Sequence, residues 1–131
     1  MGDLSKHFSR AEMGCKCGCG KLKADPRLLT LLERIREILG LPLVINSGYR
    51  CPAHNKRVGG VPNSYHTQGL AADVRCPSMT ADELWRQVRV LAQGGYLPEL
   101  GGLGRYTGRI HVDVAKAPDG HLREWDYRGR G

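Results

Sequence analysis

Two histidines and one aspartate place the strongest constraint on what this chain can fold into. His66 and Asp73 stand seven residues apart, with a glycine between them, and His111 follows on a predicted strand. Two imidazoles and one carboxylate form a protein ligand set for zinc that leaves the fourth position to water, as in catalytic rather than structural zinc sites. A fold that gathers these side chains predicts a metal-dependent hydrolase. The alternative for Asp73 is a salt bridge to an arginine.

Two amphipathic helices are predicted. Asp25 is a helix N-cap that precedes a proline, and the helix that it opens ends at Gly40. Apolar residues at three- and four-residue steps form its buried face: Leu28, Leu31, Leu32, Ile35, Ile38 and Leu39. Thr80 and Glu83 have the spacing of a capping box, and they open a second helix that extends to about Gln93.

Short apolar or alternating runs predict strands at 43–45, 70–75, 103–106 and 109–114. The last two form a hairpin that turns at Thr107 and Gly108. Alternation along the final strand places His111 and Asp113 on one face and its apolar residues on the other. A loop over 51–65, with one helical turn at 52–58, is long enough to be functional. These elements predict an α+β fold in which helices flank a small antiparallel sheet and the site lies on the exposed sheet face.

A chain of 131 residues is expected to form one domain, 1–131. Within it, residues 1–24 are predicted to be an irregular, Cys-rich arm, and residues 115–131 a charged tail anchored by Trp125. The sequence contains neither an apolar run of ~18 residues nor the apolar core of a signal peptide at its start. We therefore expect synthesis in the cytoplasm, no membrane insertion and a monomer.

Five cysteines and a net charge of +7 leave several interpretations open. An odd number of cysteines without a secretion signal argues against a disulfide framework. Cys15, Cys17 and Cys19 are dense enough for a second metal, but the spacing is not the usual C-x-x-C and no matching pair follows, so the sequence does not favour one. Cys51 and Cys76 could meet in space.

The positive charge favours polyanions such as anionic cell-wall polymers, although simple solubility explains it equally well. Nucleic acid is disfavoured as a partner, because aromatic residues are only 6% of the chain and no recognition-helix or finger spacing occurs.

The pattern Ser64-x-His66-x-x-Gly69-x-Ala71-x-Asp73, followed by a later histidine on a strand, resembles the zinc D-Ala-D-Ala carboxypeptidase family. That superfamily also includes the L-alanyl-D-glutamate endopeptidases of phage lysins and the hedgehog-type fold. The runs 47–50, 58–60 and 63–64 and Asn55 also resemble the pattern of this family. The opening from Leu4 to Glu12, with the cysteines that follow it, is similar to small phage and prophage members, so the resemblance covers about residues 4–115.

This resemblance implies a role for each site residue. His66, Asp73 and His111 would bind one catalytic Zn²⁺, although such a set also accepts other divalent ions. Arg50 would stabilise an oxyanion or hold a substrate carbonyl or carboxylate. Ser64 and Tyr49 would contribute hydrogen bonds to substrate or cap turns.

The general base is open, because several members carry an acid three positions before the last histidine, where this chain has Gly108. Asp113 is one candidate for the base; it could instead orient His111 as a metal ligand. Glu99, just before the hairpin, is a third option.

The substrate that the resemblance implies is the peptide stem of bacterial peptidoglycan. The reaction could be that of a D,D-carboxypeptidase or of an endopeptidase that cuts L-Ala-D-Glu or a D,D cross-link, and the phage-like opening favours the endopeptidase. To reach the cell wall or periplasm, the protein would need release or export by another factor. The alternative function is a catalytically inactive, zinc-containing module that binds cell wall.

Overall fold

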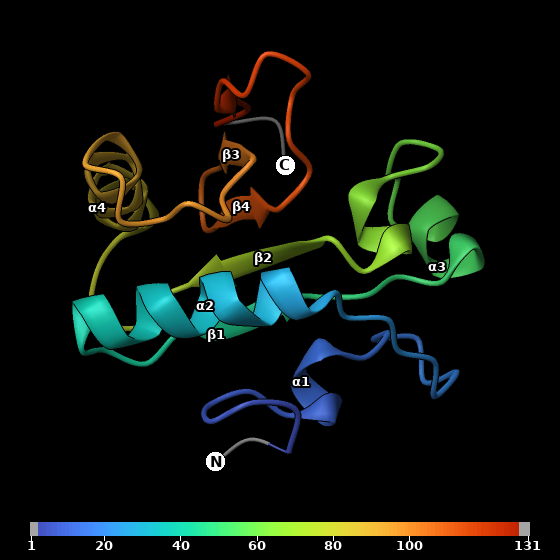
Figure 1. Ribbon diagram of the computed structural model, residues 1–131. Helices are drawn as coiled ribbons and strands as arrows, with labels where there is room; N and C mark the ends of the chain where they lie inside the picture. Colours follow the sequence, from blue (N-terminus) through green and yellow to red (C-terminus); the bar gives the residue numbers. More distant parts are fainter. Residues whose placement is uncertain (1–2, 129–131) are drawn as a thin grey trace.

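In the computed structural model, which describes residues 3–128, the two long helices pack against one face of a five-stranded sheet (Figure 1). The helices are α1 (Arg10–Met13), α2 (Pro26–Leu39), α3 (Pro52–Arg57), the 3-10 helix η1 (Tyr65–Gln68) and α4 (Ala81–Gln93). The strands are β1 (Val44–Ser47), β2 (Ala71–Arg75), β3 (Gly102–Arg105), β4 (Ile110–Asp113) and β5 (Arg123–Asp126). They form one sheet in the order β1-β2-β4-β3-β5. The predicted α+β class is confirmed.

The two long helices begin and end where the capping residues predict. The Asp25 carboxylate accepts a hydrogen bond from the backbone N–H of Arg27 at 2.8 Å, and Gly40 ends α2 in the left-handed conformation with φ of 66°. At the start of α4, the Thr80 hydroxyl accepts from the backbone N–H of Glu83 at 3.1 Å. Local hydrogen bonding therefore sets both helices before any packing is considered.

The core lies between these helices and the sheet. Figure 1 shows α2 lying across β1 and β2. One contiguous cluster joins the helices to the sheet: Leu28, Leu31, Leu32 and Ile35 of α2, Leu84 and Val88 of α4, and Ile45, Ala72, Val74, Leu103, Ile110 and Val112 of the strands. Because strand side chains alternate between faces, burying these residues leaves the intervening positions of β2 and β4 on the opposite face.

The register of the central strands brings distant polar residues together. β2 and β4 pair antiparallel, with Asp73 opposite His111 and Ala71 opposite Asp113. Directly opposed residues point to the same face of a sheet. Asp73, His111 and Asp113 therefore share the face opposite α2 and α4.

The C-terminal segment corrects the prediction of a purely antiparallel sheet with a charged tail. Residues 123–126 form β5, which pairs parallel to β3, so the sheet is mixed. Backbone bonds from Arg123 N–H to the Gly101 carbonyl (3.0 Å) and from Tyr127 N–H to the Arg105 carbonyl (2.7 Å) hold the strand. Pairing between backbones, and not Trp125 alone, fixes this segment.

The N-terminal arm is part of the main core and contains one short helix. Ser9 and Glu12 form a complete capping box on α1. Phe8 and Met13 of the arm are fully buried in the main cluster. The arm is irregular over most of its length, but Phe8 and Met13 are as inaccessible as the buried leucines of α2.

Cys51 and Cys76, which the sequence left open to meet in space, lie in separate clusters. Cys76 is buried in the main core, whereas Cys51 packs with Cys15 and Cys17 in a separate small cluster. The cause is topological, because Cys76 follows β2 toward the helices while Cys51 caps α3 beside the arm. No helix within residues 3–128 is both long and apolar enough to cross a membrane.

Candidate metal centre

Three separate elements bring the predicted ligands to one point. His66 lies on η1, Asp73 on β2 and His111 on β4. The Oδ1 atom of Asp73 is 3.2 Å from Nε2 of His66 and 3.2 Å from Nδ1 of His111. One ligand atom from each residue lies within 4.8 Å of the other two, and all three residues are buried. The convergence expected from the sequence is present.

The loop around His66 fixes the orientation of its ring. The Ser64 hydroxyl caps η1 by accepting from the backbone N–H of His66 at 3.2 Å. The Nδ1 atom of His66 donates to the Gly48 carbonyl oxygen at 2.8 Å, which turns Nε2 toward Asp73. Gly69 then ends η1 with φ of 75°, where a Cβ atom would lie 2.7 Å from the Lys23 backbone, so glycine is required there.

Asp113 fixes the orientation of the His111 ring, as the Gly48 carbonyl fixes that of His66. Its Oδ2 atom lies 2.7 Å from Nε2 of His111, so that nitrogen donates to the carboxylate and Nδ1 faces Asp73. Its Oδ1 atom accepts from the Ala115 backbone N–H at 3.1 Å and from the Arg123 guanidinium. Asp113 is fully buried, and its two oxygens are used within the protein.

Two arginines hold the other oxygen of Asp73. Nη2 of Arg50 lies 3.2 Å and Nε of Arg109 3.5 Å from Oδ2. Arg50 is itself fixed by Ser47 Oγ (3.0 Å) and Asn55 Oδ1 (3.3 Å). Oδ2 is thus directed to guanidinium groups, which leaves Oδ1 to the two imidazoles.

The pKa values of the three central groups follow from these contacts. Burial raises the pKa of the Asp73 carboxyl, but hydrogen bonds from His111 and His66 outweigh it and hold the pKa far below its usual range. The pKa of Asp113 is lowered in the same way, with burial opposed by His111 and Arg123. Burial lowers the pKa of His111, but Asp113 and Asp73 raise it above its ordinary value. The site therefore holds two carboxylates in their charged form.

This donor set fits zinc. Tetrahedral zinc with nitrogen and oxygen ligands at about 2.0–2.2 Å places neighbouring ligand atoms about 3.3 Å apart, close to the two observed separations of 3.2 Å. Histidine ligands of zinc usually donate their second N–H to a carbonyl or carboxylate, as His66 and His111 do. Three protein ligands leave one position for water or substrate.

Two glycines on β3 let β5 reach this centre. In the register of the sheet, Gly102 and Gly104 lie between β4 and the side chains of Arg123 and Trp125. A Cβ atom would lie 2.5 Å from the Arg123 guanidinium at Gly102 and 2.5 Å from Trp125 Nε1 at Gly104. Because β3 has no side chains at these positions, Arg123 contacts Asp113, and the Trp125 ring lies 4.9 Å from that of His111.

A cavity of about 750 Å³ opens over the three ligands. Its lining combines the ligands with loop, arginine and aromatic residues: Arg50, Val58, Gly59, Gly60, Val61, Asn63, Ser64, Tyr65, His66, Asp73, Tyr106, Arg109, His111, Arg123, Trp125 and Tyr127. The long loop that the sequence marked as functional forms one wall, where the Asn55 side chain holds it by donating to the Val61 carbonyl at 2.9 Å.

Of the remaining predicted site residues, some line the cavity and others do not. Arg50 and Ser64 line the cavity, whereas Tyr49 does not; it is buried against Cys15 and Cys51. A hydrogen bond from Tyr49 to substrate therefore does not follow from its position. Glu99 lies outside the lining too, in a two-bond pair with Arg34 at 3.0 and 2.9 Å.

Sequence reasoning missed several residues of the cavity wall, chiefly Arg109, Arg123 and the tyrosines Tyr65, Tyr106 and Tyr127. One signal could have found some of them. Glycines alternate at 102 and 104 on β3, and Arg123 and Trp125 alternate with the same period of two. If the two segments pair, the large side chains of one lie over the glycines of the other.

Comparison with known proteins gives one family. A family model described as Peptidase M15 matches residues 6–113. No curated protein matches the sequence. The matched region includes all three ligands and ends at Asp113, before β5.

Proposed function

The chain belongs to the peptidase M15 family, and from that premise we propose that it is a zinc-dependent peptidase that hydrolyses the peptide stems of bacterial peptidoglycan. The observation that carries the proposal is the arrangement of His66, Asp73 and His111, whose imidazoles are each oriented by a second hydrogen bond. A site with ligands already oriented binds metal without reorganising the protein.

When bound, zinc would supply a Lewis acid and a water whose pKa is lowered to about 7. The chain's own residues set up the rest of the chemistry. His66, Asp73 and His111 hold the ion at the cavity, and Arg50 lines the same cavity beside Asp73. Three of the N–H groups of Arg50 bond to Ser47, Asn55 and Asp73, so its guanidinium is held in place to stabilise negative charge on a substrate oxygen.

We assign Asp113 a positioning role rather than that of the general base. A base must come within hydrogen-bond reach of the attacking water. Asp113 is fully buried, does not line the cavity, and bonds to His111, Arg123 and the Ala115 N–H. These contacts support the interpretation in which Asp113 fixes the tautomer of His111.

The charge of the cavity supports an anionic peptide as substrate. Arg50, Arg109 and Arg123 line it, whereas Asp73 is the one carboxylate among its lining residues within the described chain. Peptidoglycan stems carry free carboxylates, for which guanidinium groups are the matching partners. The aromatic residues beside the arginines provide flat apolar surface, with Arg109 stacked 4.5 Å above the Tyr106 ring.

The test is mass spectrometry of the soluble products released from purified peptidoglycan. We expect new stem-peptide fragments that disappear with a chelator and return with zinc. Their masses and new termini will distinguish a carboxypeptidase from an L-Ala-D-Glu or D,D-endopeptidase. The His66→Ala variant should release none. His121→Ala is the matched control, since the side chain of His121 is 85% exposed, and it should release as much as the wild type.

One observation favours a second candidate, a zinc-containing module that binds cell wall without cutting it. Apart from the ligand Asp73, the described lining residues include no carboxylate that could act as a base. If the folded, zinc-loaded protein sediments with peptidoglycan and releases no fragments, this second function replaces the first.

A further inference from the structure

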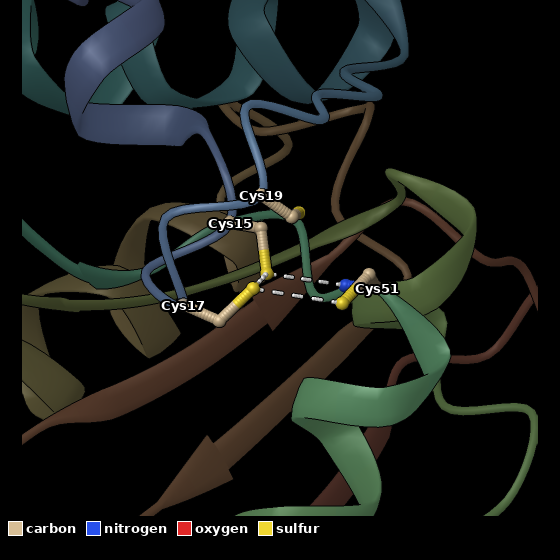
Figure 2. Close-up of side chains that lie close together, drawn as sticks. All are labelled: Cys15, Cys17, Cys19 and Cys51. Atoms are coloured by element: carbon tan, nitrogen blue, oxygen red, sulfur yellow. Dashed lines mark hydrogen bonds between the residues drawn. The ribbon is translucent and has the colours of Figure 1, made fainter.

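Four cysteine thiols gather at a place away from the cavity (Figure 2). Cys15, Cys17 and Cys19 come from the N-terminal arm, and Cys51 is the residue that caps α3. The Sγ atoms of Cys15 and Cys17 are 3.3 Å apart, and those of Cys17 and Cys51 are 3.7 Å apart. All four sulfur atoms lie within 4.8 Å of one another, and the cysteines are free thiols.

The local sequence explains how three alternating cysteines reach one point. The arm reverses direction in a tight loop, closed by a hydrogen bond from the Cys15 N–H to the Lys21 carbonyl at 3.1 Å. Gly18 and Gly20 adopt φ of 86° and 76°, the left-handed conformation that glycine accepts without strain. The two glycines therefore allow the tight turn that brings the three thiols of the arm together.

The fourth thiol is brought by the contact between the arm and the segment after β1. The Tyr49 N–H donates to the Met13 carbonyl at 2.8 Å, two residues from each of the cysteines that meet there. A Cβ atom at Gly48 would lie 2.5 Å from that same carbonyl, so the two backbones approach as closely as glycine permits. Cys51 consequently packs against Cys15, although 36 residues separate them in sequence.

The spacing of these sulfur atoms is that of a metal site. Four thiolates at about 2.3 Å from a tetrahedral zinc ion lie about 3.8 Å from one another. The 3.7 Å between Cys17 and Cys51 is close to this value, and the 3.3 Å between Cys15 and Cys17 is shorter. Backbone N–H groups already point at two of the sulfurs. The Cys51 N–H lies 3.3 Å from Cys15 Sγ, and the His54 N–H lies 3.4 Å from Cys51 Sγ, as is common around thiolate ligands.

We propose that Cys15, Cys17, Cys19 and Cys51 bind a second, structural zinc ion. Four sulfur ligands close the coordination sphere and leave no position for substrate, so the ion has no part in hydrolysis. Binding converts the four thiols to thiolates and releases their protons to solvent. The sequence did not favour this site because the spacing of the three cysteines is not C-x-x-C and no matching pair follows. The fold supplies the fourth ligand, Cys51, from the segment after β1.

The consequence for the molecule is a link between the arm and the catalytic centre. Cys51 directly follows Arg50, which contacts Asp73, and Gly48 accepts the hydrogen bond of His66. An ion that ties Cys51 to the arm holds this whole segment, 47–51, in position. Loss of the ion should therefore loosen the support of His66 and Arg50 without removing a catalytic ligand.

Zinc content of the full chain tests the proposal. After reconstitution and gel filtration, inductively coupled plasma mass spectrometry should find about two zinc ions per chain, one from each set of ligands. The variant Cys19→Ser, at the exposed cysteine of the cluster, should lose about one. His66→Ala should also lose about one, from the other site, and Cys76→Ala should lose none, because Cys76 lies in the main core.

Cobalt gives a readout that does not depend on stability or activity. Co²⁺ bound by thiolates shows a sulfur-to-metal charge-transfer band in the near ultraviolet, which His66→Ala should keep and Cys19→Ser should reduce. A wild type with about one zinc per chain that only His66→Ala removes, or a fall in intact mass that shows disulfides in the reconstituted protein, overturns the proposal. Because the two variants address different ions, failure here leaves the proposed peptidase activity standing.

Discussion

The substitution Gly104→Ala should displace the side chain of Trp125, which extends from β5 toward His111. The added Cβ atom would lie 2.5 Å from Nε1 and 2.6 Å from Cε2 of Trp125. Non-bonded heavy atoms of this kind settle about 3.5–4.0 Å apart, so the indole must retreat by about 1 Å. The retreat weakens the ring contact with His111 and the 3.0 Å hydrogen bond from Trp125 to the Tyr106 hydroxyl.

The expected cost of Gly104→Ala is that of overpacking a buried position, about 1–3 kcal/mol of the free energy of unfolding. The measurement is urea unfolding followed by circular dichroism at a fixed zinc concentration, compared with the wild type. The matched control is Gly108→Ala on the same hairpin, where a Cβ atom would meet no other atom within 4 Å. That variant should stay within about 0.5 kcal/mol of the wild type.

A double-mutant cycle with Trp125→Ala identifies the cause. If the methyl group destabilises the protein by displacing the indole, Gly104→Ala should cost far less when the indole is already absent. Residues that do not interact give additive costs within about 0.5 kcal/mol. Additive costs, or a Gly104→Ala variant as stable as Gly108→Ala, would refute the role assigned to the glycine.

Three further outcomes are expected. Asp113→Asn should weaken zinc affinity by about 10–100-fold in a competition titration, because His111 loses its orienting carboxylate; unchanged affinity with lost turnover would instead make Asp113 the base. Glu33 has a pKa below its ordinary value of 4.5: burial raises it, but bonds from Ser5 and His7 outweigh that effect. Its stabilisation is therefore full above that pH and is lost as the pH falls, so Glu33→Gln should cost about 1–3 kcal/mol at pH 7 and progressively less in unfolding titrations below pH 4.5. Finally, added salt should reduce activity on whole cell wall more than on a short stem peptide, since screening acts on the +7 charge of the chain; equal sensitivity would remove the basic surface from substrate binding.

The elements that the sequence predicts best are those with local causes. The bounds of α2 follow from Asp25, Pro26 and Gly40, whose effects reach only neighbouring residues. The hairpin of β3 and β4 follows from a short turn between alternating runs. β5 has no such signal, because its four residues include three charged ones and its pairing with β3 crosses the intervening β4 segment of the chain.

The residues of the candidate site also differ in how well the sequence predicts them. His66, Asp73 and His111 stand out because two imidazoles and a carboxylate are a zinc ligand set, and the fold brings them together. Arg109 and Arg123 do not stand out by themselves, since arginine is ordinary on a surface. Arg109 is placed by the start of β4, and Arg123 by the register of β5 on β3. The metal actually bound, the bond that is cut and a phage-like origin stay predictions.

β5 also affects what happens between molecules. It is the last strand at one edge of the sheet, and such an edge presents unpaired N–H and C=O groups on which a strand from another chain can form. Arg123, Glu124 and Asp126 place charges along this edge, and a second chain that paired with it would strip these charges of water. The strand that completes the surroundings of His111 thus also discourages the sheet from growing into an aggregate.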